Sequence, residues 1–224
     1  MSKVYNFMKL KYKYLIIFAA ILILIFGICF LVNKKAPIIY ESKVSNSYII
    51  DYPSKYNYRQ TINDCGPFNV AAVIRALAKK EIKSSDFAKN MKWRLPNKYT
   101  LPWGLEKQLQ ENDISIEIPN IKALPDKEKI IFLKERLSQN KPIIILGEAN
   151  GYEHYMTIFG FNSLKDEFYI YDSMYDKNEE GFTVDDNNSL PGNRNFTSKE
   201  LLNFWRGGGM YGVYNWYTIV ADKK

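Results

Sequence analysis

The sequence is poor in the two residue types that most often bind metals or form cross-links. It contains one histidine and two cysteines in 224 residues. A zinc site usually takes about four such ligands, so neither zinc nor another cofactor is expected. The two cysteines are not expected to pair, because Cys29 lies within an apolar run and Cys65 lies in the polar part of the chain. The thiol of Cys65 and the imidazole of the single histidine are therefore available for catalysis.

The charge pattern excludes two further classes of function. Lysine and arginine number 31 against 24 acidic residues, a formal net charge of +7. These basic residues are scattered and do not alternate with aromatic ones, so nucleic-acid binding is not predicted, whereas an anionic surface such as a membrane suits the surplus. The aspartates at 172, 176, 185 and 186 lack the regular spacing and fixed glycine of a calcium loop. No metal site is therefore predicted.

A single long apolar run stands near the N-terminus. Residues 14–32, YLIIFAAILILIFGICFLV, carry no charge and nearly match the thickness of a hydrocarbon core of about 30 Å when helical. Four lysines precede the run and two follow it, which predicts a cytoplasmic N-terminus. A cleaved signal peptide is the alternative, but its apolar region usually spans only about 7 to 15 residues and ends in a small-x-small site. A retained anchor is favoured.

This pattern predicts four parts, in the order cytoplasmic tail 1–13, transmembrane helix 14–32, polar stalk 33–56 and globular domain 57–224. The stalk is inferred from its polar composition and from Pro37 and Pro53. The expected location is the cell membrane, with a single span and the globular domain on the extracytoplasmic side. The membrane is thus one expected partner.

The globular part is predicted to be an α+β domain, because helical patterns come first and strand patterns follow. Apolar spacing and a capping-box motif predict helices over 65–80, 85–91, 105–111, 127–139 and 197–205. Runs rich in β-branched and aromatic residues predict strands over 116–118, 143–146, 155–161, 168–171 and 214–220. The polar link 162–167 predicts an antiparallel hairpin, and 175–195 is expected to be a long loop.

Cys65 lies where a thiol can become a nucleophile. It precedes Gly66 and Pro67 at the predicted start of the first helix of the domain, where free N–H groups and the helix dipole favour a thiolate. A nearby imidazolium is the second common means of activating a thiol. His154, the only histidine, is therefore the expected base. A structural buried thiol is the alternative interpretation of Cys65.

His154 is predicted to stand at a strand start, and it needs a partner that fixes its tautomer. Asp172 follows the next predicted strand, eighteen residues later, so the hairpin would return its carboxylate to the histidine. Gln60, five residues before Cys65, could donate a side-chain N–H to an oxyanion, together with the backbone N–H of Cys65. An exposed loop amide is the alternative for Gln60.

These residues resemble a known family. The segment from Gln60 to Pro67, with His154 at a strand start and Asp172 after Tyr169-Ile170-Tyr171, looks like the bacteriocin-processing, C-39-like type of papain-like cysteine peptidase. The resemblance runs from about Gln60 to the C-terminus, and the helix ending in Asn203-Phe204-Trp205 is similar to a late element of those domains. It implies a papain-like fold, N-terminal helices packed on a mainly antiparallel sheet, and a Cys65, His154 and Asp172 triad with Gln60 at the oxyanion.

The expected function is thiol-dependent hydrolysis of a peptide or protein substrate. The best-known family members are cytoplasmic domains fused to transporters and cut leaders after a double glycine, whereas this domain is expected to face outward, so leader processing is not predicted. Two alternatives remain open. One keeps the triad but acts on cell-wall peptides or transfers an acyl group. The other is a non-catalytic domain that binds peptides or acts in immunity.

Overall fold

The computed structural model describes residues 45–174, 190–209 and 212–224. The predicted anchor at 14–32, half of the predicted stalk and most of the predicted loop after Asp172 lie outside these residues. No helix within the described ranges is long and apolar enough to cross a bilayer.

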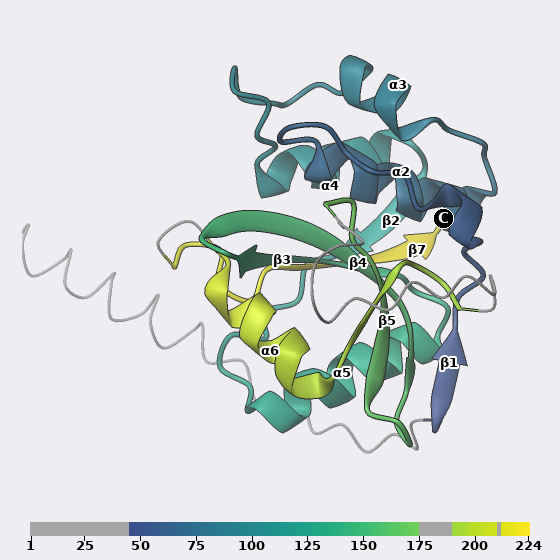
Figure 1. Cartoon of the computed structure of the whole chain (residues 1–224), viewed down its shortest axis with the longest axis vertical. Helices are drawn as coiled ribbons and strands as arrows, with labels where there is room; N and C mark the ends of the chain where they lie inside the picture. The colour runs from purple at the N-terminus through teal and green to yellow at the C-terminus, as the bar shows by residue number, and fades with distance from the viewer. Residues whose placement is uncertain (1–44, 175–189, 210–211) are drawn as a thin grey trace, which may run out of the picture. The chain divides into compact units, whose positions relative to one another are not determined.

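The centre of the domain is one seven-stranded sheet (Figure 1). Six strands follow the order β2-β7-β3-β4-β5-β6, and β1 pairs with β4. Each registered pair is antiparallel. The strands are β1 (Ser47–Ile49), β2 (Ile114–Glu117), β3 (Ile143–Ala149), β4 (Tyr152–Asn162), β5 (Glu167–Tyr171), β6 (Arg194–Phe196) and β7 (Thr218–Lys223).

Helices cover both faces of this sheet. Figure 1 shows one group above it and two helices below it. The upper group is α2 (Cys65–Ala78), α3 (Ser84–Asn90) and α4 (Pro102–Glu111), and the lower helices are α5 (Asp126–Ser138) and α6 (Ser198–Gly207). Side chains alternate across a strand, so Ile144 and Leu146 of β3 pack in the core with α2 and α4, whereas Ile143 and Ile145 pack in the core with α5 and α6.

Helix α2 is buried from Cys65 to Leu77. A helix that is apolar on all sides belongs in the interior of a protein, and α2 contacts α3, α4, β4 and β7. It ends at Ala78, and the following residue, Lys79, forms a left-handed cap with a φ of 53°. Because α2 is buried, its first residue, Cys65, has a fixed position relative to β4.

The five predicted helices and the 162–167 hairpin are confirmed, with helix ends within about three residues of expectation. The predicted capping box is present, because the Thr197 side chain accepts from the Glu200 N–H and the Glu200 side chain accepts from the Thr197 N–H. Strand β7 starts four residues later than predicted, since 212–216 form turns. Two short strands, β1 and β6, were not predicted.

The predicted boundary between stalk and domain needs a correction. Residues 47–49 form β1 against β4, and Ile50 and Tyr52 are buried in the core. The Tyr52 ring stacks on Phe159 with ring centroids 4.2 Å apart. The fold therefore includes the last residues of the predicted stalk, because they supply a strand and two core side chains.

Candidate active site

Cys65 is the first residue of α2, and its side chain is largely buried. The neighbouring Gly66 has to be small, since a Cβ there would lie 2.9 Å from the Thr100 side chain. Phe68 donates its N–H to the Asp64 carbonyl at 3.1 Å, which is the first helical hydrogen bond. The free N–H groups of the first turn thus lie next to the thiol, where they stabilise negative charge.

His154 and Asp172 form a buried pair. His154 lies in β4, opposite Gly147 of β3, and its Nε2 is 2.7 Å from Oδ1 of Asp172. Burial alone would lower the pKa of His154. The Asp172 carboxylate and the Cys65 side chain outweigh burial and raise that pKa to about 10, which favours an imidazolium at neutral pH.

Three groups hold Asp172. Its Oδ2 accepts from the Arg194 guanidinium at 2.6 Å, and its Oδ1 also accepts from the Met174 N–H at 2.9 Å. The Asn193 side chain accepts from the Asp172 N–H at 2.8 Å and donates to its carbonyl at 2.9 Å. Burial would raise the pKa of Asp172, but His154, Arg194 and the Met174 N–H lower it overall. The carboxylate therefore stays charged and fixed.

The other ring nitrogen of His154, Nδ1, is buried and makes no conventional hydrogen bond within the described ranges. The Cys65 side chain lies near enough to raise the pKa of the imidazole. The ring therefore stands between a carboxylate on one side and a thiol on the other, the arrangement that activates a cysteine.

Gly147 and Phe204 also lie next to the imidazole of His154. The Phe204 ring of α6 meets the His154 ring edge-on, with centroids 6.4 Å apart. Phe204 reaches this place because residue 147 is glycine; a Cβ there would lie 2.3 Å from the Phe204 ring. The missing side chain at Gly147 of β3 therefore leaves room for the Phe204 ring, which keeps water from the imidazole of His154.

Gln60 lies beside Cys65 and its side chain is oriented. The Ser173 hydroxyl donates to Gln60 Oε1 at 2.6 Å, and the Gln60 backbone N–H donates to the Ser173 carbonyl at 2.8 Å. Because Oε1 is engaged by Ser173, the amide nitrogen is the end left to serve as a donor. Gln60 and Cys65 line the same cavity of about 410 Å³.

Asn69, one turn after Cys65, connects the helix of the thiol to the strand of the histidine. Its side-chain nitrogen donates to the carbonyls of Cys65 at 2.9 Å and Tyr155 at 2.8 Å. Its side-chain oxygen accepts from the Thr157 hydroxyl at 2.6 Å. This fully buried amide fixes α2 against β4 at the level where Cys65 faces His154.

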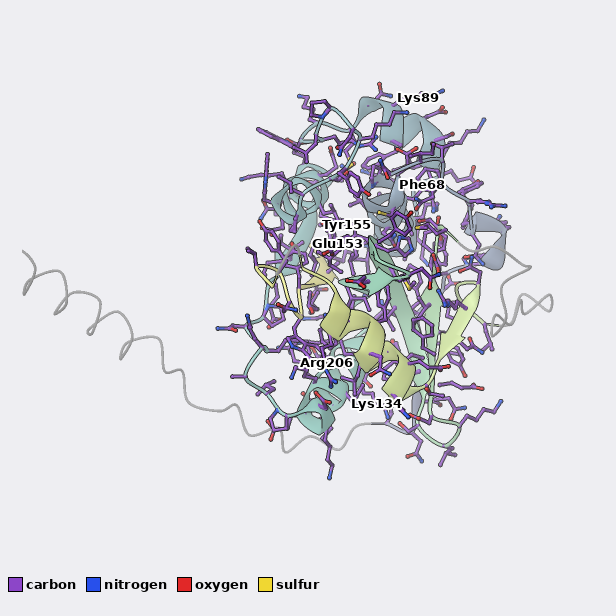
Figure 2. The ribbon with its side chains drawn as sticks, turned by 60° about the vertical axis from the view of Figure 1, so that its left-hand side comes forward. Phe68, Lys89, Lys134, Glu153, Tyr155 and Arg206 are labelled. Atoms are coloured by element: carbon purple, nitrogen blue, oxygen red, sulfur yellow. The ribbon has the colours of Figure 1, made fainter. Side chains whose placement is uncertain are left out.

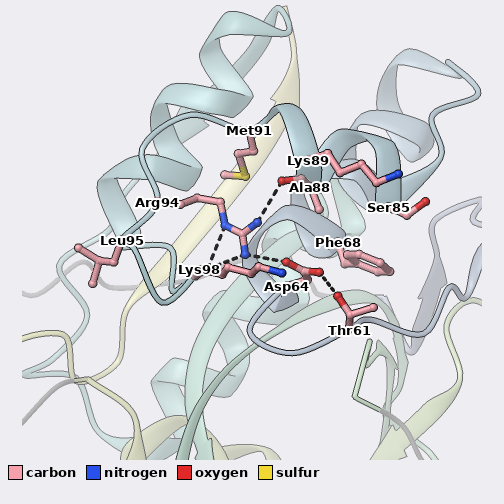
Figure 3. Close-up of a pocket in the computed structure, with 10 residues that line it drawn as sticks. All are labelled: Thr61, Asp64, Phe68, Ser85, Ala88, Lys89, Met91, Arg94, Leu95 and Lys98. Atoms are coloured by element: carbon pink, nitrogen blue, oxygen red, sulfur yellow. Dashed lines mark hydrogen bonds and ion pairs between the residues drawn. The ribbon is translucent and has the colours of Figure 1, made fainter.

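An ion pair braces the loop that leads into α2. The Arg94 guanidinium is 2.6 Å from the Asp64 carboxylate and also donates to the Asn63 carbonyl at 3.0 Å. Thr61 donates to the other oxygen of Asp64. Figure 3 shows the contacts of Arg94 and Thr61 with Asp64 beside a separate cavity of about 440 Å³, between this loop and the segment that follows α3. Cys65 is not among the residues that line this cavity.

The structure thus brings all four predicted residues, Cys65, His154, Asp172 and Gln60, to one place. Sequence reasoning missed the supporting residues Asn69, Arg194, Asn193 and Ser173. The one signal available was a polar residue among the apolar residues of a predicted helix, and it applied to Asn69. Within the described part of the chain, no cluster of three or more histidine, cysteine or acidic side chains is arranged to hold a metal ion.

Comparison with known proteins gives one family match. The model of the Peptidase_C39 like family matches residues 49–196. No curated protein matches the chain significantly. Several solved structures are similar to it, including the following two. One is the peptidase domain of Streptococcus ComA, a bi-functional ABC transporter involved in a quorum sensing pathway (13% identity, TM-score 0.46, covering 78% of this chain and 100% of that one). The other is a double glycine motif protease from an AMS/PCAT transporter in complex with the leader peptide (11% identity, TM-score 0.47, 80% and 100% covered).

The family match covers more than half of the chain and contains all four predicted site residues. It confirms the resemblance drawn from the sequence. The chain therefore belongs to the Peptidase_C39 like family and is a cysteine peptidase.

Proposed function

We propose that Cys65, His154 and Asp172 form the catalytic triad of this peptidase and that Gln60 contributes to its oxyanion hole. The observation that carries the proposal is the buried imidazole of His154, 2.7 Å from the Asp172 carboxylate and adjacent to the Cys65 thiol. A carboxylate that orients a histidine beside a nucleophile is the arrangement used in acyl transfer.

In the proposed reaction, the Cys65 thiolate attacks the carbonyl carbon of a peptide bond, and a tetrahedral intermediate forms. The Cys65 N–H and the Gln60 amide donate to its oxyanion. His154 gives a proton to the leaving amine as the C–N bond breaks, which leaves a thioester. Water, deprotonated by His154, then attacks the thioester and releases the acid and the thiol. Asp172 keeps the imidazole in place throughout.

Limited alkylation tests the nucleophile. The full-length chain at neutral pH is treated with less than one equivalent of iodoacetamide, and the labelled residue is identified by mass spectrometry. Cys65 is expected to react at least tenfold faster in the folded chain than in denaturant, and His154→Gln is expected to remove that advantage. Equal rates in the folded and unfolded chain would contradict the assignment.

Comparison of cells carrying the unmodified chain with cells carrying Cys65→Ala identifies the substrate class. New protein N-termini that disappear with the Ala variant support a peptidase acting on proteins. If the two kinds of cell differ in their wall-derived peptides and not in their protein N-termini, the activity is that of a wall amidase. No change in either, together with slow alkylation, would favour a non-catalytic binding role.

We further propose that residues 14–32 anchor the enzyme in the cell membrane, with the catalytic domain on the extracytoplasmic side. The uncharged apolar run and the surplus of lysines before it support this orientation. In intact spheroplasts, added protease is expected to degrade the domain. Protection of the domain until the membrane is opened would reverse the orientation.

A further inference from the structure

A second cavity at the thiol, of about 290 Å³, adjoins the Gln60 cavity. The two cavities share Cys65, Tyr99, Tyr152 and Glu153 as lining residues. A peptide lying across Cys65 therefore passes from one cavity to the other. Glu153 and Tyr155 of β4 mark this region in Figure 2, between the helical layer that carries Phe68 and the helix that carries Arg206.

The walls of the second cavity are mainly apolar. They come from the segment before α4, from β3 and from β4, and the apolar contributors are Leu95, Leu101, Pro102, Leu146 and Tyr155. An extended peptide places successive side chains on opposite sides at about 3.3 Å per residue. A side chain within two residues of the scissile bond is therefore within reach of this cavity.

Two polar side chains of the cavity already have hydrogen-bond partners. The Tyr155 hydroxyl donates to the Thr100 carbonyl at 3.1 Å, and burial with the nearby Cys65 raises the pKa of Tyr155 well above its usual value. The Glu153 carboxylate accepts from the Gly209 N–H at 2.9 Å, whereas the Thr100 hydroxyl is buried and makes no hydrogen bond to any residue that the structure describes. A charged side chain entering here would lose water and gain little in return.

We propose that this cavity is the specificity pocket of the enzyme and that it receives a large apolar side chain, such as leucine or phenylalanine, within two residues of the bond that is cut. The proposal rests on the proposed function only in taking Cys65 as the point of attack. A pocket of this kind discriminates by roughly 10- to 200-fold for each methylene that fits. Substrates with glycine, aspartate or lysine at that position are expected to be cut at least tenfold more slowly.

Leu101 offers a variant that changes the pocket without removing the helix behind it. Leu101 is the N-cap residue of α4, and aspartate is among the preferred residues at that position. Leu101→Asp is therefore expected to fold and to place a carboxylate in the pocket wall. Leu164→Asp is the matched control, because Leu164 is exposed in the turn between β4 and β5.

The first measurement uses the full-length chain and a peptide library randomised on both sides of the cut, with the products sequenced. The unmodified chain and Leu164→Asp are expected to prefer leucine or phenylalanine at one position at least tenfold. Leu101→Asp is expected to lose that preference and to gain cleavage at lysine or arginine. No apolar preference in the unmodified chain, or a preference for lysine read through Glu153, would overturn the proposal.

The second measurement needs no turnover. Blocked tripeptides Ala-X-Ala compete with iodoacetamide for Cys65, and those with X as leucine or phenylalanine are expected to slow labelling severalfold more than those with X as glycine or glutamate. If leucine and phenylalanine peptides protect Cys65 best but no peptide is hydrolysed, the specificity pocket is supported and the proposed function is contradicted. If peptides are hydrolysed without any preference and the competitors protect equally, the pocket falls and the function stands.

Discussion

Asn69 and Thr157 are hydrogen-bonded at 2.6 Å although 88 residues separate them in the sequence. The same Asn69 amide donates to the carbonyls of Cys65 and Tyr155. One side chain therefore ties the backbone of Cys65 to the residue that follows His154. The distance between Cys65 and His154 depends on this bridge as well as on the packing of α2.

Asn69→Ala is expected to lower kcat/KM by about 10- to 100-fold, because small displacements of reacting groups are costly. Two backbone carbonyls and a hydroxyl would lose their partner in the core, so the free energy of unfolding should fall by roughly 1–3 kcal/mol. Urea denaturation and steady-state kinetics measure the two effects. Asn90→Ala is the control, since Asn90 is exposed and bonds only within α3. Unchanged kcat in Asn69→Ala would show that the bridge does not position the site.

Gln60→Ala is expected to reduce kcat by about 10²- to 10³-fold with little change in KM, as the loss of one oxyanion donor does in other hydrolases. Ser173→Ala leaves the amide present and removes only the bond that orients it, so its loss in kcat should be smaller. Equal kinetics for Gln60→Ala and the unmodified chain would exclude Gln60 from the oxyanion hole.

Asp172→Asn should lower kcat/KM by about 10²- to 10⁴-fold and shift its pH profile. Asp172 raises the pKa of His154 to about 10, so the alkaline limb of the unmodified enzyme is expected near pH 10, where the imidazolium is lost. Without the carboxylate that limb should move to lower pH. An alkaline limb at the same pH in both proteins would mean that the Asp172 charge does not set the state of His154.

The stability of the domain should also depend on pH through this pair. The pKa of His154 is raised in the folded state, from 6.5 to about 10, so its contribution is full below about pH 6.5 and is lost as pH rises towards 10. The pKa of Asp172 is lowered from 3.8, so its contribution is full above about pH 4 and is lost as pH falls further. Urea denaturation should therefore give higher stability at pH 5.5 than at pH 9.5.

The control for this effect is His154→Gln, in which the difference between pH 5.5 and pH 9.5 should be smaller than in the unmodified chain. Other groups titrate alike in both proteins, so the difference between the two pH dependences reports the pair. The same slope in both proteins would contradict the assignment of the effect to His154.

The sequence was sufficient to predict which four side chains the structure brings together at the candidate site. The thiol and the imidazole were unambiguous because the chain has a single histidine and a single cysteine outside the apolar run. The position of Asp172 followed from the predicted hairpin around 162–167, because the length of a hairpin can be read from neighbouring residues. Helix α2 was predictable since its apolar spacing and its proline in the first turn act within a few residues.

The supporting contacts were not predictable, because they join residues that are far apart in the sequence. Asn69 meets Tyr155 across 86 residues, and no local pattern encodes that distance. Strands β1 and β6 have three residues each, too few for an alternating pattern, and they owe their form to pairing with β4 and β5. The aromatic residues before β7 resemble a strand in composition, yet Trp216 has a φ of 63° and packs on Trp205 from a turn.

The bonds from Arg194 and Asn193 to Asp172 bear on how such an enzyme can diversify. Arg194 bonds the Asp172 carboxylate and Asn193 bonds the Asp172 backbone, so the two ends of the stretch between Asp172 and Asn193 are held together. Doubling the length of a closed loop costs only about 0.6 kcal/mol. Insertions and deletions between these ends can therefore accumulate over evolution while the histidine keeps its partner.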